Sequence, residues 1–192
     1  MTEICFIRHG QTDWNVARKI QGTAQTTLNE TGKQQAAQCA QHLQKEKWDR
    51  IITSPLQRAV ETAEIIGSAL GIETIMKEKN WGEREYGEAT GWSYEQLFAG
   101  LERGTITGIE SEKALSERAK SGLNRILQDY PNQRILVVSH GVTILAALNA
   151  GFDTPLPHEE VHLKNGCLNR MKHSDNRWNV LSYNDQNHLL PT

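Results

Sequence analysis

Residues 4–12 read ICFIRHGQT, an apolar run that ends in an arginine, a histidine and a glycine. A second apolar run, ILVV at 135–138, leads into SHGVT, so His9 and His140 each follow such a run and precede a glycine. Short continuous apolar runs bounded by glycine are typical of buried strands in a parallel sheet. Ligands of open α/β sheets bind outside the carboxyl ends of the strands. The two histidines are therefore predicted to face one pocket.

Helices and strands alternate along the rest of the sequence. We expect residues 13–27 to form a loop, Asn29 to cap a helix, and Ser54 to cap another with Pro55 at its first position. Further helices are predicted near 116–130 and 142–150, and further strands over 48–53, 72–76, 134–138, 167–171 and 178–183, the last two as a hairpin or edge strands. This alternation predicts an α/β fold, a three-layer αβα sandwich with a mainly parallel sheet.

Composition is that of one globular domain spanning residues 1–192, with 38% hydrophobic and 23% charged residues. Residues at about 80–112 are predicted to form a cap-like insertion with one helix near 94–101. A net charge of −2 argues against a nucleic-acid surface, and no apolar stretch approaches the roughly 20 residues that cross a bilayer. Three cysteines without a CxxC motif favour reduced thiols, so we expect a cytoplasmic protein. Its oligomeric state is left open.

Two arginines are placed where they can bind an anion near the histidines. Arg8 precedes His9, and Arg58 falls in the first turn of the helix that starts at Ser54. Guanidinium groups and a helix N-terminus together are suited to a phosphate dianion. Their positive charge should lower the pKa of His9 and keep it a neutral nucleophile, while His140 donates a proton or hydrogen bond to the phosphoryl group.

Five motifs in this sequence resemble those of the histidine phosphatase superfamily, which has the phosphoglycerate mutase-like fold. They are RHGQTDWN at 8–15, QG at 21–22 with LNETG at 28–32, SPLQRA at 54–59 with TA at 62–63, EREYG at 83–87 with Gly91, and VSHG at 138–141. They occur in family order between residue 3 and about residue 183, which is effectively the whole chain. The resemblance implies a single histidine phosphatase domain. Gln25 and residues 89–90 depart from the family pattern.

The resemblance also implies roles for individual residues. His9 would attack phosphorus through one ring nitrogen while a backbone carbonyl holds the other N–H. Glu83 would protonate the leaving alkoxide and later activate water. Arg8, Arg58 and His140 would complete the catalytic set by binding the phosphoryl oxygens. The expected substrate-binding residues are Asn15, Gln21, Gly22, Arg84, Tyr86, Gly141 and Val142.

The function that follows is a histidine acid-type phosphatase, a phosphomonoester hydrolase for small phosphorylated metabolites. The alternative enzyme is a cofactor-dependent phosphoglycerate mutase, because EREYG is similar to the mutase form of that motif. Mutases carry a longer insertion with paired arginines, which this chain lacks, and its residues 108–111 resemble the phosphatase group. A non-catalytic interaction module is disfavoured because every catalytic position holds the residue type that the chemistry needs.

One motif points to a metal. HEEVH at 158–162 fits the H-E-x-x-H zinc pattern, which requires both histidines on one helical face. Prolines at 155 and 157 and Asn165-Gly166 leave little room for that helix, and no third ligand is evident. We therefore expect a polar loop and no metal. Nucleotide-binding glycine motifs are absent, so no cofactor is predicted.

Overall fold

The computed structural model describes residues 1–152, 154–156 and 161–190. Within them, six strands form one sheet in the order β3-β2-β4-β1-β5-β6. The elements are β1 (Thr2–Arg8), α1 (Asp13–Val16), α2 (Glu30–Leu43), β2 (Arg50–Thr53), α3 (Gln57–Leu70), β3 (Ile75–Lys77), η1 (Lys79–Trp81), η2 (Gly87–Ala89), α4 (Tyr94–Arg103), α5 (Glu112–Asp129), β4 (Arg134–Ser139), α6 (Gly141–Leu148), β5 (Leu168–Ser174) and β6 (Arg177–Asp185).

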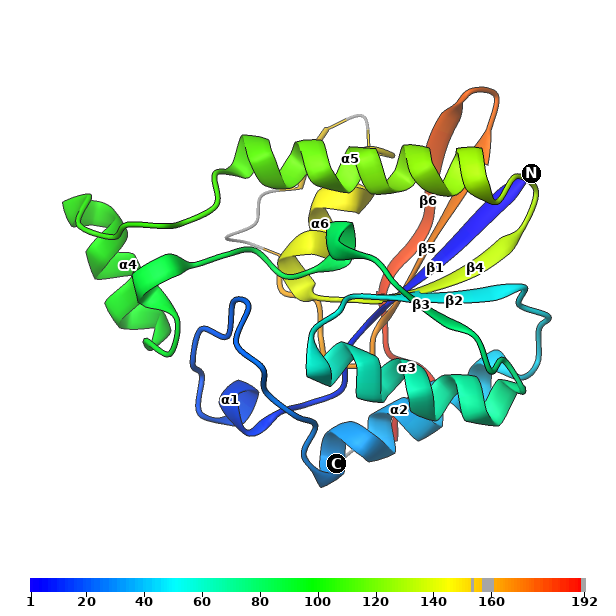
Figure 1. Cartoon of the computed structure of the whole chain (residues 1–192), viewed down its shortest axis with the longest axis horizontal. Helices are drawn as coiled ribbons and strands as arrows, with labels where there is room; N and C mark the ends of the chain where they lie inside the picture. Colours follow the sequence, from blue (N-terminus) through cyan, green and yellow to red (C-terminus); the bar gives the residue numbers. More distant parts are fainter. Residues whose placement is uncertain (153, 157–160, 191–192) are drawn as a thin grey trace.

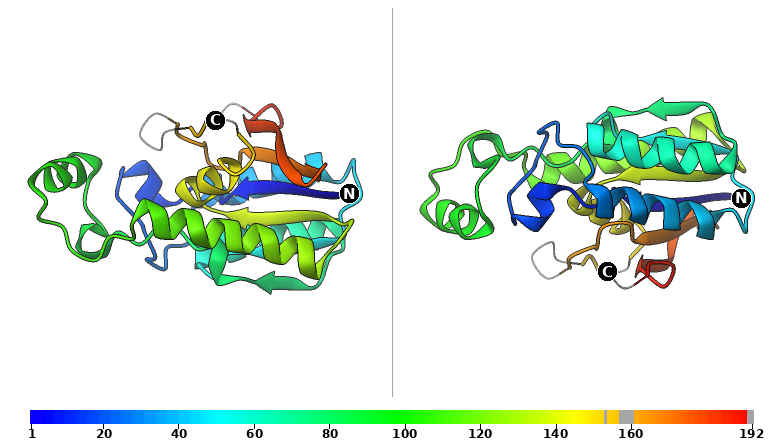
Figure 2. Two further views of the ribbon diagram at one scale, coloured as in Figure 1. Left: turned by 90° about the horizontal axis from the view of Figure 1, so that it is seen from above. Right: turned by 90° about the horizontal axis from the view of Figure 1, so that it is seen from below.

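The sheet is parallel from β1 to β4 and antiparallel at one edge, where β5 pairs with β1 and β6 with β5. Helices α5 and α6 cover one face, and α2 and α3 cover the other (Figures 1 and 2). The predicted αβα sandwich with a mainly parallel sheet is therefore confirmed. The predicted hairpin is confirmed as well: Asp175 and Asn176, both with positive φ, form the turn between β5 and β6.

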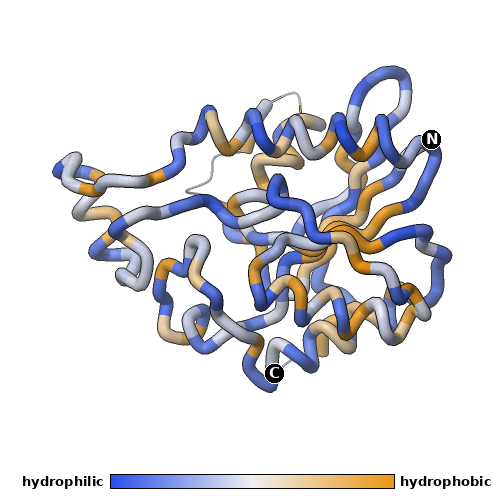
Figure 3. The backbone as a smooth tube through the Cα atoms, in the orientation of Figure 1, coloured by the Kyte–Doolittle hydropathy of each residue, from blue (hydrophilic) through white to orange (hydrophobic). Residues whose placement is uncertain are grey.

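Alternate residues of β1 face opposite layers. Ile4 and Phe6 pack in a cluster with Leu123 of α5, whereas Cys5 and Ile7 pack with Ala63 of α3. Because both faces of the strand are covered, its sequence is continuously apolar instead of alternating. Figure 3 shows the hydrophobic residues concentrated in these central strands.

Several predicted element boundaries were wrong, among them the strand predicted over 72–76, which is β3 at Ile75–Lys77. The stretch expected to be a loop at 13–27 begins with α1, because Thr12 and Asn15 form a capping box. Helix α5 begins at Glu112, since Ser111 accepts a hydrogen bond from the Ala114 N–H. Helix α3 begins at Gln57 and its N-cap is Leu56, which makes no side-chain capping bond. Ser54 therefore does not cap α3, although its Oγ accepts from the Leu56 N–H at 3.2 Å.

The segment at 80–112, predicted to be a cap-like insertion, contains α4 where the sequence predicted a helix and the short turn η2, whereas η1 packs against α5 and β4. Helix α4 lies beyond the sandwich, on the side to which the carboxyl ends of the parallel strands point (Figures 1 and 2). Its ends are capped in the expected way, by Ser93 and by Gly104 with positive φ. No helix in the described ranges combines the length and the apolarity needed to cross a membrane.

Candidate active site

His9 and His140 lie together at the carboxyl ends of β1 and β4. Their ring centroids are 5.1 Å apart, and both side chains are buried. The pairing of β1 with β4 brings the strand ends together, since Arg8 lies beside Ser139 in the parallel register. The backbone N–H of His9 donates to the backbone carbonyl of Ser139 at 3.0 Å, which fixes the start of the loop after β1. The sheet thus joins the two histidine motifs in one site.

The hydrogen bonds of His9 define its tautomer. Nδ1 lies 2.7 Å from the Gly10 carbonyl oxygen, which only accepts, so Nδ1 carries the proton. Nε2 accepts from Arg58 Nε at 3.2 Å. Burial holds the pKa of His9 well below its ordinary value of 6.5, and the nearby Arg58 and Arg8 lower it further. His9 is therefore a neutral imidazole whose unprotonated Nε2 accepts from Arg58, and burial contributes more to this neutrality than the positive charge predicted from sequence.

Arg58 is 1% exposed and is held by the loop after α1. Its Nη1 donates to the Ala24 carbonyl at 2.8 Å, and its Nη2 donates to the Gly22 carbonyl at 2.8 Å. Burial lowers the pKa of Arg58 to about 10, with Glu83 opposing and Arg8 adding to the shift. The guanidinium remains charged at neutral pH and is fixed beside His9, as an anion-binding group requires.

Gln21 and Gly22 contribute to this loop rather than lying against the imidazoles. Gln21 Oε1 accepts from the hydroxyls of Thr12 at 3.0 Å and Thr26 at 2.6 Å. Gly22 has a φ of +48°, a conformation that favours glycine, and its carbonyl points to Arg58. Both residues therefore position Arg58.

Glu83 lies at the N-terminus of α6. Its Oε1 accepts from the Arg84 N–H at 2.8 Å, the Thr143 N–H at 3.3 Å and the Thr143 hydroxyl at 3.2 Å. Oε2 has one donor, the Val142 N–H at 3.5 Å. The first N–H groups of a helix have no partner within it and favour a carboxylate. Helix α6 thus fixes Glu83 and leaves Oε2 the less saturated oxygen.

The other two catalytic candidates each bind a neighbouring residue. His140 Nε2 lies 2.7 Å from Ser54 Oγ, and the pKa of His140 is well below 6.5 through burial first and then Arg58. Arg8 donates through Nη1 to the Leu163 carbonyl. Within the described residues, His140 Nδ1 and Arg8 Nε are buried without hydrogen-bond partners. Two other buried atoms, Trp81 Nε1 and His188 Nδ1, also lack partners among the described residues, but only the atoms of Arg8 and His140 lie at the paired histidines.

Asn15, Arg84 and Tyr86, which were predicted to bind substrate, have partners within the protein, and Gly141 lies against Arg8. Asn15 Oδ1 accepts from the Thr12 N–H at 3.1 Å as part of the α1 cap. Arg84 donates through Nε to the Glu110 carbonyl at 2.9 Å and lies 5.7 Å from the centre of the Tyr86 ring. Gly141 is the first residue of α6, and a Cβ there would lie 3.6 Å from Arg8 Nε. Substrate contacts by these residues therefore remain predictions.

Four further residues shape the site but were not predicted as site residues: Thr62, Asn165, Gly32 and Ser54. Thr62 Oγ1 accepts from the Gly10 N–H at 3.1 Å, and Asn165 Nδ2 donates to the His9 carbonyl at 3.0 Å. Gly10 packs on Gly32, whose carbonyl oxygen would be 2.3 Å from a Cβ at position 10. Glycine follows His9 because the backbone of α2 lies there. Ser54, which contacts His140, was predicted only as a helix cap.

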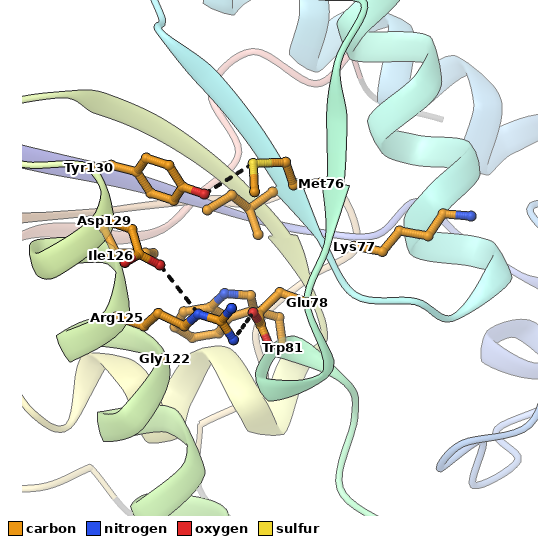
Figure 4. Close-up of a pocket in the computed structure, with 10 residues that line it drawn as sticks. Met76, Lys77, Glu78, Trp81, Gly122, Arg125, Ile126, Asp129 and Tyr130 are labelled. Atoms are coloured by element: carbon orange, nitrogen blue, oxygen red, sulfur yellow. Dashed lines mark hydrogen bonds and ion pairs between the residues drawn. The ribbon is translucent and has the colours of Figure 1, made fainter.

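A cavity of about 440 Å³ lies beside Glu83. It is lined by Thr23, Pro55, Leu56, Lys79, Gly82, Glu83, Glu85, Glu110 and Arg118. This cavity is large enough for a small phosphorylated molecule. A second cavity of about 40 Å³ lies between α5 and β3, where Arg125 pairs with Glu78 at 2.8 Å (Figure 4). It has room for only a few water molecules and includes none of the predicted site residues.

Metal-binding side chains do not gather at this site. In the described part of the chain, no group of three or more His, Cys, Asp and Glu residues is arranged to hold a metal ion. Residues 158–160 of the H-E-x-x-H pattern lie outside the described residues, so the zinc alternative is not addressed by the structure.

We expect His9 to make the free energy of unfolding fall as pH decreases below 6.5. The unfolded chain binds a proton there with the ordinary pKa of 6.5, whereas the folded chain keeps the imidazole neutral. Such a group lowers stability by about 1.4 kcal/mol per pH unit between 6.5 and its folded pKa. Urea unfolding of the wild type and His9→Ala, at neutral pH and at several lower values, should show a slope smaller by about that amount in the variant. Equal slopes would contradict the buried neutral imidazole.

Known proteins match this chain along nearly its whole length. A sequence model of the histidine phosphatase superfamily (branch 1) matches residues 4–186. The uncharacterized phosphatase PhoE of Bacillus subtilis (strain 168) is 37% identical over 191 residues, which are 98% of this chain and 97% of that protein. The probable phosphoglycerate mutase GpmB of Erwinia tasmaniensis is 32% identical over 189 residues, covering 93% and 88%. A mutant phosphoserine phosphatase from Entamoeba histolytica, solved with phosphoserine, has a TM-score of 0.88 at 27% identity, covering 99% of this chain and 100% of that one.

Proposed function

The chain belongs to the histidine phosphatase superfamily, and we propose that it hydrolyses small phosphomonoesters through a phosphohistidine formed on His9. The observation that carries the proposal is the state of His9. Its Nδ1 proton is engaged by the Gly10 carbonyl at 2.7 Å, and its Nε2 faces Arg58. A neutral imidazole with a fixed Nδ1–H becomes an activated nucleophile for phosphorus once Arg58 redirects its Nε–H from Nε2 to the bound phosphoryl group.

In the first step Nε2 of His9 attacks phosphorus and the ester P–O bond breaks. Arg8, Arg58 and His140 hold the phosphoryl oxygens, so that charge developing in the transition state meets fixed donors. The unpartnered Nε of Arg8 and Nδ1 of His140 support this role, because a bound phosphoryl group would satisfy them. Glu83 gives a proton to the leaving alkoxide from Oε2, the oxygen with fewer hydrogen-bond partners.

In the second step Glu83, now a carboxylate, takes a proton from water. The resulting hydroxide attacks phosphorus and the P–N bond to His9 breaks, releasing phosphate and restoring the neutral imidazole. The same group serves as acid and then as base because water enters where the alcohol left. The cycle needs no group beyond the side chains already named.

The substrate we propose is a small phosphorylated metabolite, in keeping with the cavity beside Glu83. A relative solved with phosphoserine supports a ligand of that size. A phosphoglycerate mutase is the second candidate, because GpmB proteins share 32% identity with this chain. A mutase must return the phosphoryl group to a bound phosphoglycerate instead of to water. The products formed from phosphoglycerate therefore distinguish a phosphatase, which releases free phosphate, from a mutase, which forms the other phosphoglycerate.

A panel of phosphomonoesters tests the proposal directly. Purified protein should release inorganic phosphate from sugar phosphates, phosphoserine or p-nitrophenyl phosphate, and an excess of EDTA should leave the rate unchanged because the arginines supply the positive charge. Phosphorus NMR with 3-phosphoglycerate should show free phosphate and no 2-phosphoglycerate. Interconversion of the two phosphoglycerates would establish the mutase, and loss of activity with EDTA that zinc restores would point to the motif at 158–162.

A further inference from the structure

A partly buried ion pair lies beside Glu83 and lines the same cavity. Arg118 of α5 meets Glu110 through two bonds, from Nε to Oε1 at 2.6 Å and from Nη2 to Oε2 at 3.0 Å. The side chains are 21% and 16% exposed. A two-point contact of this kind fixes the direction of the guanidinium as well as its position. Arg118 is therefore held with its remaining N–H groups aimed in a set direction.

Those N–H groups hold the chain segment that carries Glu83. Nη1 of Arg118 donates to the Asn80 carbonyl at 2.8 Å and to the Gly82 carbonyl at 2.9 Å. The two carbonyls flank Trp81, whose ring is fully buried. A single guanidinium therefore fixes the backbone immediately before Glu83.

Arg118 also reaches the hydroxyl group that contacts the acid. Its Nη2 donates to Thr143 Oγ1 at 3.4 Å. That hydroxyl lies 2.7 Å from the Gly82 carbonyl and 3.2 Å from Glu83 Oε1. The backbone before Glu83 and one partner of its carboxyl group thus depend on the same arginine.

We propose that Arg118, oriented by Glu110, is a positioning residue that holds Glu83 in line with the leaving group. The inference rests on the proposed role of Glu83 as proton donor. Arg118 makes no hydrogen bond to either histidine in the described part of the chain, and its charge is the smallest of the causes that lower the pKa of His140. Its loss should therefore leave the attack by His9 nearly intact and should weaken mainly proton delivery. Displacing a catalytic group by about 1 Å costs on the order of a hundredfold in rate.

The test is the rate of His9 phosphorylation in single turnover, measured with an alkyl phosphate and with p-nitrophenyl phosphate. Arg118→Met should slow the alkyl ester about a hundredfold and the nitrophenyl ester by no more than about threefold, because that phenolate leaves without a proton. Adding Arg118→Met to Glu83→Gln should not widen the difference between the esters further, since both changes act on one group. Equal slowing of both esters by Arg118→Met would overturn the proposal.

Arg170→Met is the matched control. Arg170 is 20% exposed and pairs with Glu46 at 2.5 Å on the β5 strand, outside the predicted site. Arg170→Met should change the phosphorylation rates of the two esters by the same factor.

If Arg118→Met does not fold, Glu110→Gln is measured in its place. A smaller loss of rate that is confined to the alkyl ester is expected, and an equal loss for both esters would contradict the proposal. If Glu83→Gln slows both esters equally, Glu83 is not the proton donor and that part of the proposed function is wrong. If Glu83→Gln slows the alkyl ester selectively but Arg118→Met does not, only the role of Arg118 is rejected.

Discussion

His9→Ala should reduce phosphomonoester turnover by roughly 10⁴-fold or more, the scale expected when a covalent nucleophile is removed. Alanine has no lone pair to attack phosphorus, and water is not positioned to replace it in the first step. The fold should persist, because Arg58 keeps its bonds to the carbonyls of Gly22 and Ala24. Rapid quenching after mixing with a radioactive phosphoester should trap an acid-labile, base-stable adduct on the wild type and none on the variant.

A second histidine serves as control for this experiment. His173 lies on β5 with its ring 5.2 Å from that of Trp178 and away from the paired imidazoles. His173→Ala should retain both turnover and the adduct. Near-normal activity in a folded His9→Ala protein would rule out the phosphohistidine, and an adduct that survives in that variant would place the nucleophile at another residue.

Local sequence patterns predicted the elements that bring the histidines together. The apolar run before each histidine requires burial on both faces, and the structure meets that requirement by covering β1 and β4 with helices on both sides. The closing residue of α3, Gly71, has the positive φ expected of glycine at a helix end. Arg58 falls in the first turn of α3 although that helix starts later than predicted. Periodicity and end signals depend on neighbouring residues, so they can be read from the chain alone.

Contacts between distant residues explain what the sequence could not predict. Ser54 has the pattern of a helix cap, but its hydroxyl lies against His140, 86 positions away. Gly10 was predicted as a glycine that bounds an apolar run, but the space beside it is filled by the backbone of Gly32. Glu83 was selected by family resemblance alone, and its partners in α6 follow 59 and 60 positions later. In each case the position of the residue is determined by a contact with a distant part of the chain, which a local sequence pattern does not contain.

Glu83→Gln should slow the phosphorylation of His9 by an alkyl phosphate about 10²–10⁴-fold, the usual contribution of a positioned acid. Glutamine can keep the carbonyl oxygen that accepts from the N–H groups of Arg84 and Thr143, so the site should retain its shape. It has no acidic proton for the alkoxide. Because p-nitrophenolate is a stable leaving group, the same step with p-nitrophenyl phosphate should slow far less. Single-turnover measurements are needed, since hydrolysis of the phosphohistidine requires Glu83 for both esters.

Glu85→Gln provides the comparison for that variant. Glu85 lines the same cavity, yet its carboxylate is engaged by the Thr23 hydroxyl at 2.7 Å and the Gly87 N–H at 2.9 Å, and these bonds keep its pKa below the ordinary value. Both oxygens of Glu85 are engaged, whereas Oε2 of Glu83 has only a contact of 3.5 Å, so Glu85→Gln should affect the two esters equally. Equal losses for both esters in Glu83→Gln, with a selective loss in Glu85→Gln or Glu88→Gln, would move the acid to that residue. A selective loss in Glu83→Gln alone would identify Glu83 as the group that protonates the departing alkoxide.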